Sequence, residues 1–220
     1  MSCPACQAST PPATRVRHED VPVYTQYATA DLIADIAYHG RDPGEDPAWA
    51  ATGARTQTEY ATWCRHLCGL TCLRMALAHR DGTAPPLLDL LRASLPHGTY
   101  LPTDDGGILG MFYAPLLEYA RIAHGLDGQV HPHLDLDQIH ERLAAGALVI
   151  ASVHKEIRRP DRPAPGTGGH LVLLTGYDTT TATLTLHNPS GHTPTSRVAE
   201  LPVDTFQTFF AYKGISFLPG

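Results

Sequence analysis

A cysteine, a histidine and an asparagine have types and surroundings that suit nucleophilic catalysis. Cys68 comes directly before Gly69 and a strongly apolar stretch at 69–79 with helical spacing. A thiol attacks as the thiolate, and the start of a helix supplies partial positive charge and free N–H groups that favour this form. Gly69 allows a substrate carbonyl to approach the backbone closely. Only Cys68, among the five cysteines of the chain, combines these features, so we predict that it is the nucleophile.

A base and a group that orients it follow in the second half of the chain. His170 comes after two glycines and begins an apolar stretch at 170–177 that is typical of a buried strand. Asn188 follows the next predicted strand, at 183–187. Antiparallel pairing of these two strands would bring Asn188 beside His170. We therefore predict that His170 is the base and that Asn188 orients its ring.

The elements that must position these residues change character along the chain. Residues 1–19 are polar and rich in proline, and we expect a flexible tail there, followed by a single domain over 20–220. The segments predicted to be helical are 30–38, 56–67, 69–79, 87–95, 113–124 and 136–145. The predicted strands are 21–24, 130–133, 147–153, 170–177, 183–187, 198–201 and 211–217. Helices that precede strands indicate an α+β protein, with the helices packed on an antiparallel sheet.

Three motifs resemble those of bacterial papain-like cysteine peptidases. They read LCGLTCLRMALAHRDG at 67–82, GGHLVLLTGYD at 168–178 and LHNPSG at 186–191. The resemblance is strongest to the peptidases that cleave the double-glycine leader peptides of exported bacteriocins, and to their free-standing relatives. It covers about residues 20–215 and implies a papain-like fold, with a helical part packed on a twisted antiparallel sheet. It also implies that Cys68, His170 and Asn188 are the nucleophile, the base and the third catalytic residue.

The same resemblance suggests a donor for the oxyanion. In this family a glutamine ahead of the nucleophile fills that role, and VPVYTQ at 21–26 is similar to the segment that carries it. Gln26 is therefore the candidate. It lies much farther ahead of Cys68 than the family glutamine does, so residues 30–67 are expected to be an insertion.

The remaining cysteines have simpler interpretations. Cys64 and Cys72 lie one helical turn on either side of Cys68, but a single helix rarely completes a tetrahedral metal site. We expect Cys72 to be a core residue and Cys64 to be partly exposed. Cys3 and Cys6 have the spacing of metal ligands, but no second pair accompanies them. We expect no metal and no cofactor.

Two polar loops also offer alternatives. Asp104 and Asp105 are expected to act as loop caps. The arginine-rich segment at 158–162 is expected to be a solvated loop, with binding of an acidic substrate group or of a carrier phosphate as the functional alternative.

Composition restricts the functional class. The net charge is −6 and no extended run of lysine and arginine occurs, so we expect no nucleic-acid partner. No apolar run reaches the roughly 20 residues of a membrane span, and the first residues do not resemble a secretory signal. We expect a cytoplasmic protein with reduced cysteines and no membrane partner.

Three functional hypotheses remain at this point. The first is a thiol-dependent hydrolase, a cysteine peptidase or amidohydrolase that acts on a peptide or amide through an acyl-enzyme. The second is an acyltransferase or amide-forming enzyme of natural-product biosynthesis, which takes its acyl group from a small molecule or a carrier protein. The third is an inactive, peptide-binding relative. The first two share the acyl-enzyme and differ in whether water or an amine resolves it.

Overall fold

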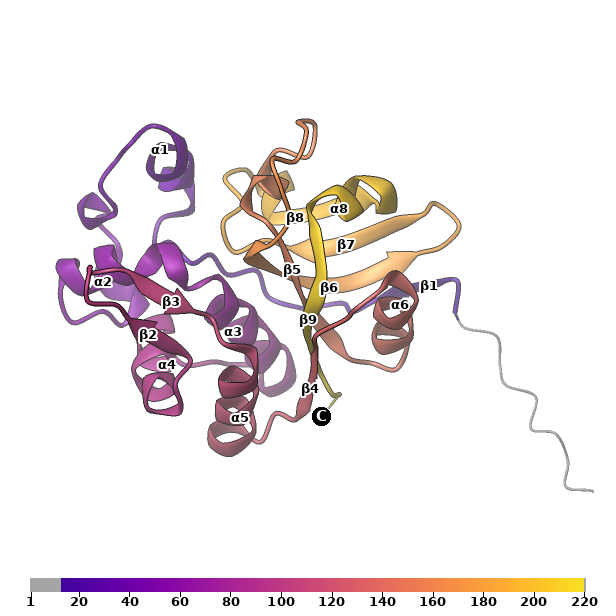
Figure 1. The fold of residues 1–220 in the computed structure, drawn as a ribbon, viewed down its shortest axis with the longest axis horizontal. Coiled ribbons are helices and arrows are strands. Elements are labelled where there is room, and N and C mark those ends of the chain that lie inside the picture. The colour runs from indigo at the N-terminus through magenta and orange to yellow at the C-terminus, as the bar shows by residue number, and fades with distance from the viewer. Residues whose placement is uncertain (1–12, 220) are drawn as a thin grey trace, which may run out of the picture.

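The computed structural model describes residues 13–219 of the chain. Figure 1 shows two parts, one made of helices from the first half of the sequence and one made of a sheet from the second half. This arrangement confirms the predicted α+β class. The helices are α1 (Ile33–Tyr38), α2 (Gln57–Trp63), α3 (Cys68–Asp81), α4 (Leu87–Ser94), α5 (Tyr113–His124), α6 (Leu136–Ala144), α7 (Pro194–Arg197) and α8 (Val203–Phe209).

The main sheet is antiparallel and contains seven of the described strands. Its path runs β4-β9-β5-β6-β7-β8, and β1 pairs with β6 beside this path. Strand β6 pairs with β5 through its first residues and with β1 through its last ones. Strands β5 and β1 therefore follow one another along the same edge of β6. The strands are β1 (Arg15–Arg17), β4 (Gly128–His131), β5 (Leu148–His154), β6 (Gly169–Asp178), β7 (Thr183–His187), β8 (Val198–Pro202) and β9 (Phe210–Phe217).

The middle of strand β6 is apolar because both of its faces are covered there. Leu171 and Leu173 pack into the core that α3, α4 and α5 share with the sheet. Val172 and Leu174 point the other way, into a second core closed by α6 and α8. The alternation of side chains along a strand explains how one stretch serves two cores. Helix α3 is tied to this strand by Cys72, whose thiol donates to the Leu171 carbonyl at 3.8 Å.

The N-terminal region differs from expectation in two ways. Residues 13–19 do not form a free tail, because Arg15–Arg17 pairs with β6 and the Tyr177 hydroxyl donates to the Ala13 carbonyl at 2.7 Å. Residues 21–24 do not form the predicted strand. Their alternating pattern includes Pro22, which has no N–H to donate to a ladder.

A small hairpin was also missed. Strands β2 (Tyr100–Pro102) and β3 (Ile108–Gly110) pair across a loop that was expected to be irregular. Within that loop the Asp105 carboxylate accepts from the Gly107 N–H at 3.1 Å, so Asp105 caps the turn as expected. The prediction failed because each strand is only three residues long.

The segment between Gln26 and Cys68 forms a small cluster of its own. Its buried apolar residues are Tyr27, Ile33, Ile36, Tyr60 and Cys64. Fully buried Asp46 holds the cluster together. Its carboxylate accepts from the Thr29 N–H at 2.8 Å, the Thr29 hydroxyl at 2.6 Å and the Tyr60 hydroxyl at 3.0 Å. This segment, residues 27–67, is therefore an ordered substructure beside the helical part, and we call it the excursion.

Candidate active site

Cys68 is the first residue of α3 and is partly exposed. Burial of the site raises the pKa of its thiol, while backbone N–H groups, of which Leu171 contributes most, and the charge of Arg158 lower it by less. The helix start therefore does not by itself produce the thiolate that the sequence suggested. A neighbouring base has to take the proton during attack.

Gly69 is closely packed against side chains from two other segments. A Cβ atom at this position would lie 2.8 Å from Leu171 Cδ1 and 2.8 Å from Met111 Cε. Any larger residue here would have to displace these two side chains, so the close packing of α3 against β6 and against the segment after β3 also favours glycine. The approach of a substrate carbonyl to this backbone stays a prediction.

His170 is the second residue of β6 and is 5% exposed. It lies opposite Val153 in the antiparallel pair with β5, so the strand fixes the position of its ring. Its Nε2 lies 2.9 Å from Oδ1 of Asn188, which follows the end of β7. The structure thus brings together His170 and Asn188 as the hairpin argument predicted.

Ser190 determines which nitrogen of a neutral His170 carries the proton. The Ser190 backbone N–H can only donate, and it lies 3.0 Å from the Asn188 atom that contacts His170. That atom must therefore be the amide oxygen, so a neutral His170 carries its proton on Nε2 and has its lone pair on Nδ1. The Ser190 hydroxyl lies 3.0 Å from His170 Nε2 and 3.2 Å from Asn188 Oδ1. Sequence reasoning did not identify Ser190, whose signal was its place two residues after Asn188.

The imidazole of His170 resists protonation in this setting. Burial lowers its pKa to about 3, against the opposing effect of the bond to Asn188, and the charge of Arg158 lowers it further. Together with the raised pKa of Cys68, this shift favours a neutral thiol beside a neutral imidazole. Such a pair generates the nucleophile by proton transfer when the thiol attacks.

Gln26 lies between the two halves of the site and is 2% exposed. Its backbone N–H donates to the Pro189 carbonyl at 2.9 Å, and its Nε2 donates to the Cys64 carbonyl at 2.7 Å. Although the excursion separates Gln26 from Cys68 in sequence, its last part brings Cys64 into contact with Gln26 just before α3 begins. One hydrogen of the amide remains for another acceptor. The oxyanion role of Gln26 stays a prediction.

The other described cysteines are poor nucleophiles. Cys64 is completely buried, in contrast to the expected partial exposure, because it belongs to the cluster around Tyr60. Burial raises its pKa to about 12. Burial also raises the pKa of Cys72 well above the ordinary range. Cys3 and Cys6 lie outside the described residues.

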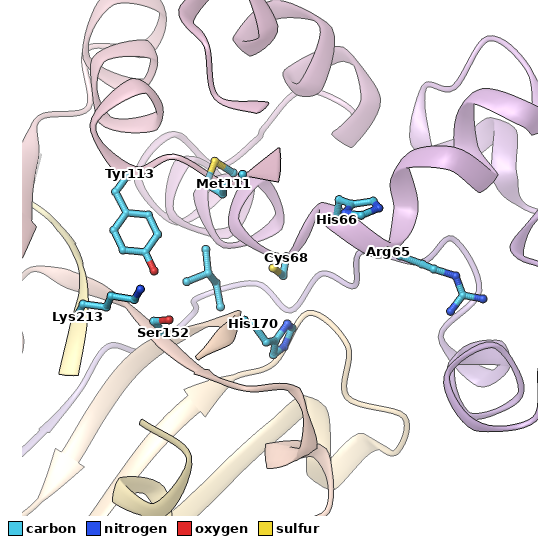
Figure 2. A pocket seen from close by; sticks show the side chains of 11 residues that line it. Arg65, His66, Cys68, Met111, Tyr113, Ser152, His170 and Lys213 are labelled. Carbon is cyan, nitrogen blue, oxygen red and sulfur yellow. The ribbon is translucent and has the colours of Figure 1, made fainter. Parts of the chain in front are cut away.

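A cavity of about 250 Å³ opens beside Cys68 and His170 (Figure 2). Its walls come from α3, β6, β5, β9 and the segment after β3. They combine apolar and polar side chains, which are suited to an acyl group with a polar backbone. The lining residues are Arg65, His66, Cys68, Gly110, Met111, Tyr113, Ser152, Gly169, His170, Leu171 and Lys213.

The arginine-rich segment departs from the expected solvated loop. Arg158 is only 8% exposed, whereas Arg162 in the same loop is exposed.

None of the helices within residues 13–219 is both long and apolar enough to cross a membrane. No group of three or more acidic, histidine or cysteine side chains in this part of the chain is arranged to hold a metal ion.

Comparisons with known proteins found similar solved structures and one family. A C39-like peptidase from Bacillus anthracis is 14% identical, with a TM-score of 0.57 over 93% of this chain and 97% of that one. The peptidase domain of Streptococcus ComA, a bifunctional ABC transporter of a quorum-sensing pathway, is 16% identical, with a TM-score of 0.47 over 71% of this chain and 93% of that domain. No curated protein matches the sequence. The sequence profile of the Peptidase_C39 like family matches residues 19–218, and the chain therefore belongs to this family.

Proposed function

We propose that this protein is a cysteine peptidase or amidohydrolase that cleaves a peptide or amide bond through an acyl-enzyme. The observation that carries the proposal is the 2.9 Å bond between His170 Nε2 and Asn188 Oδ1, with Cys68 and His170 lining one cavity. This bond leaves Nδ1 of His170 as the base. The family to which the chain belongs supports a peptidase in general terms.

The reaction follows from these positions. Nδ1 of His170 takes the thiol proton as Sγ of Cys68 attacks the carbonyl, and the Cys68 backbone N–H and Nε2 of Gln26 hold the oxyanion. His170 then gives the proton to the leaving amine, whose bond to the carbonyl breaks as the thioester forms. Water, deprotonated by His170, attacks the thioester and releases the acid and the thiol.

The acyltransferase hypothesis shares every step up to the thioester. An amine in place of water would then produce an amide, with the acyl group drawn from a small molecule or a carrier protein. Partition of the acyl-enzyme between hydrolysis and aminolysis, measured with increasing concentrations of added amines, separates the two. If the free acid remains the main product as the amine concentration rises, the result supports the hydrolase.

A substitution series tests the proposal itself. Turnover of a peptide library and iodoacetamide labelling at the active thiol should both be lost in Cys68→Ala. Cys64→Ala is a matched control, because this thiol is buried and is expected to be unlabelled in the native protein. Survival of turnover in Cys68→Ala, or equal labelling of both thiols, would refute the mechanism.

The three described cysteines are free thiols, in keeping with the cytoplasmic location that we propose.

A further inference from the structure

An arginine that the mechanism does not use is buried near the catalytic pair. Arg158 belongs to η6 (Lys155–Arg158), which follows β5, and its guanidinium carbon lies 5.6 Å from the centre of the Tyr38 ring in α1. The guanidinium of Arg159 lies 3.9 Å from the same ring centre, and the ring of His192 meets it edge-on at 5.7 Å. The excursion and the sheet part therefore meet in an aromatic and cationic cluster.

Arg158 forms no ion pair within the part of the chain that the structure describes, although its charge, together with that of Arg159, lowers the pKa of the Glu156 carboxylate against the effect of burial. No carboxylate there lies within 4.0 Å of its guanidinium, and the neighbouring Glu156 is bound by Arg159, whose Nε donates at 2.9 Å. Nε of Arg158, the Tyr38 hydroxyl and Nδ1 of His192 are all buried, and none has a hydrogen-bond partner among the described residues. A buried charge is costly without a counter-ion, so binding of an anion here would be favourable.

The cluster lies on one side of the catalytic pair. In Figure 2, Met111, Tyr113 and Lys213 lie to one side of Cys68 and His170, and Arg65 lies to the other. Arg65 donates to the Ile36 carbonyl at 3.2 Å, so the excursion that carries Tyr38 is on the Arg65 side.

The charge of the cluster acts on Cys68 and His170, and a cavity lies next to the cluster. The charge of Arg158 lowers the pKa of both Cys68 and His170, although burial has the larger effect on each group. Arg158, Arg159 and His192 line a cavity of about 520 Å³ between η6 and α7. Asp161 and Glu200 line it as well, and both are exposed to solvent.

We propose that Arg158, Tyr38 and His192 form a subsite for an anionic group, a carboxylate or a phosphate, on the leaving part of the substrate. The two parts of a substrate extend in opposite directions from the scissile bond. The cavity beside Cys68 is suited to the acyl part, so the leaving part extends toward the excursion. The inference rests on the proposed function, because it assigns a substrate class to the same site.

Alkylation of Cys68 by two reagents of nearly equal size tests the field of Arg158 without any substrate. Iodoacetate carries a negative charge and iodoacetamide does not, and both react with the same thiolate, so their rate ratio is independent of the thiol pKa. Arg158→Gln should lower the iodoacetate-to-iodoacetamide ratio about threefold or more. Arg158→Lys, which keeps the charge, should retain most of the ratio, and Arg162→Gln is the matched control from the same loop. An unchanged ratio in folded Arg158→Gln would overturn the proposal.

Two further measurements identify the anion and the side of the substrate. Phosphate or acetate, compared with chloride at equal ionic strength, should raise the melting temperature of the wild type but not of Arg158→Gln. The effective anion distinguishes phosphate from carboxylate, and an effect of neither contradicts the subsite. Among cleaved peptides, Arg158→Gln should reduce kcat/KM for free C-terminal acids and spare the matched amides. Equal loss for both would overturn the subsite while leaving the peptidase intact, whereas an Arg158-dependent alkylation ratio without any cleavage would refute only the peptidase.

Discussion

The backbone N–H of Ser190 donates to Oδ1 of Asn188 at 3.0 Å, and this bond orients the amide that holds His170. Asn188 Oδ1 accepts from the histidine, from the Ser190 N–H and from the Ser190 hydroxyl. The turn after β7 thereby sets the tautomer of His170. The proposed catalytic arrangement depends on this turn.

We expect Asn188→Ala to reduce kcat by about 100-fold, because the imidazole loses its orienting acceptor and the reacting atoms lose alignment. Ser190→Ala should cause a smaller loss in kcat with little change in KM, since the amide keeps its backbone donor. Steady-state kinetics on a cleaved peptide measures both effects. Thr208→Ala, which removes an exposed hydroxyl far along the chain, is the control. Unchanged kcat in Asn188→Ala would contradict the assigned role.

The pH dependence of activity should follow the shifts of the catalytic pair. Protonated His170 cannot accept the thiol proton, and burial lowers its pKa to about 3, so activity should persist below the ordinary histidine pKa. The raised pKa of Cys68 predicts that alkylation by iodoacetamide continues to rise with pH through the ordinary thiol range. Profiles of kcat/KM and of alkylation rate test both statements. An acid limb near pH 6.5 together with a low-pH alkylation plateau would indicate a preformed ion pair instead.

Gln26→Glu tests the oxyanion donor with little change in shape. The carboxylate has no N–H to give to the oxyanion, so kcat should fall by about 10²- to 10³-fold. The variant also loses the bond to the Cys64 carbonyl, so its unfolding free energy must be measured alongside. A loss of stability with kcat preserved in the remaining folded enzyme would assign Gln26 to structure alone.

Asp46 should control the stability of the excursion. Its pKa is lowered because hydrogen bonds from Thr29, Ala48 and Tyr60 outweigh the opposing effect of burial. Because the folded pKa is lowered, the stabilisation is complete above the unfolded carboxyl pKa of about 3.9 and is lost as pH falls through the lowered value. Asp46→Asn should lower the free energy of unfolding by about 2 kcal/mol at neutral pH.

Denaturant titration measures this change, and Asp31→Asn, at an exposed position of the same segment, is the control. Equal stability of Asp46→Asn and the wild type at neutral pH would show that the buried carboxylate is not what holds the cluster. Because the excursion carries Tyr38, loss of Asp46 should also reduce the effect of Arg158 on alkylation.

Much of the fold and site could be predicted from local patterns. The helix next to Cys68, predicted from residue 69, the hairpin of β6 and β7, and the bounds of α5 follow from apolar periodicity and from glycine positions. Long-range pairing could not be predicted this way. Strand β5 pairs only with Gly169–Leu174 of β6, and β1 pairs with Gly176–Asp178 of the same strand. No pattern at 15–17 reveals this pairing.

Side chains whose role depends on a distant partner were the ones missed. Arg158 is buried near the ring of Tyr38, which comes from a remote segment, whereas the charged stretch 158–162 by itself indicated a solvated loop. Cys64 is buried by the cluster around Tyr60, which a helical pattern alone does not indicate. Gly69 was identified, but its tight packing against Met111 depends on a segment that lies far along the chain.

The most direct test of the central claim is the mass of the intact protein during turnover of an activated ester or thioester. We predict a covalent acyl adduct that forms in the wild type, maps to Cys68 by fragmentation, accumulates in Asn188→Ala and is absent from Cys68→Ala. An adduct on another residue, or turnover without any adduct on Cys68 in a rapid quench, would contradict the account.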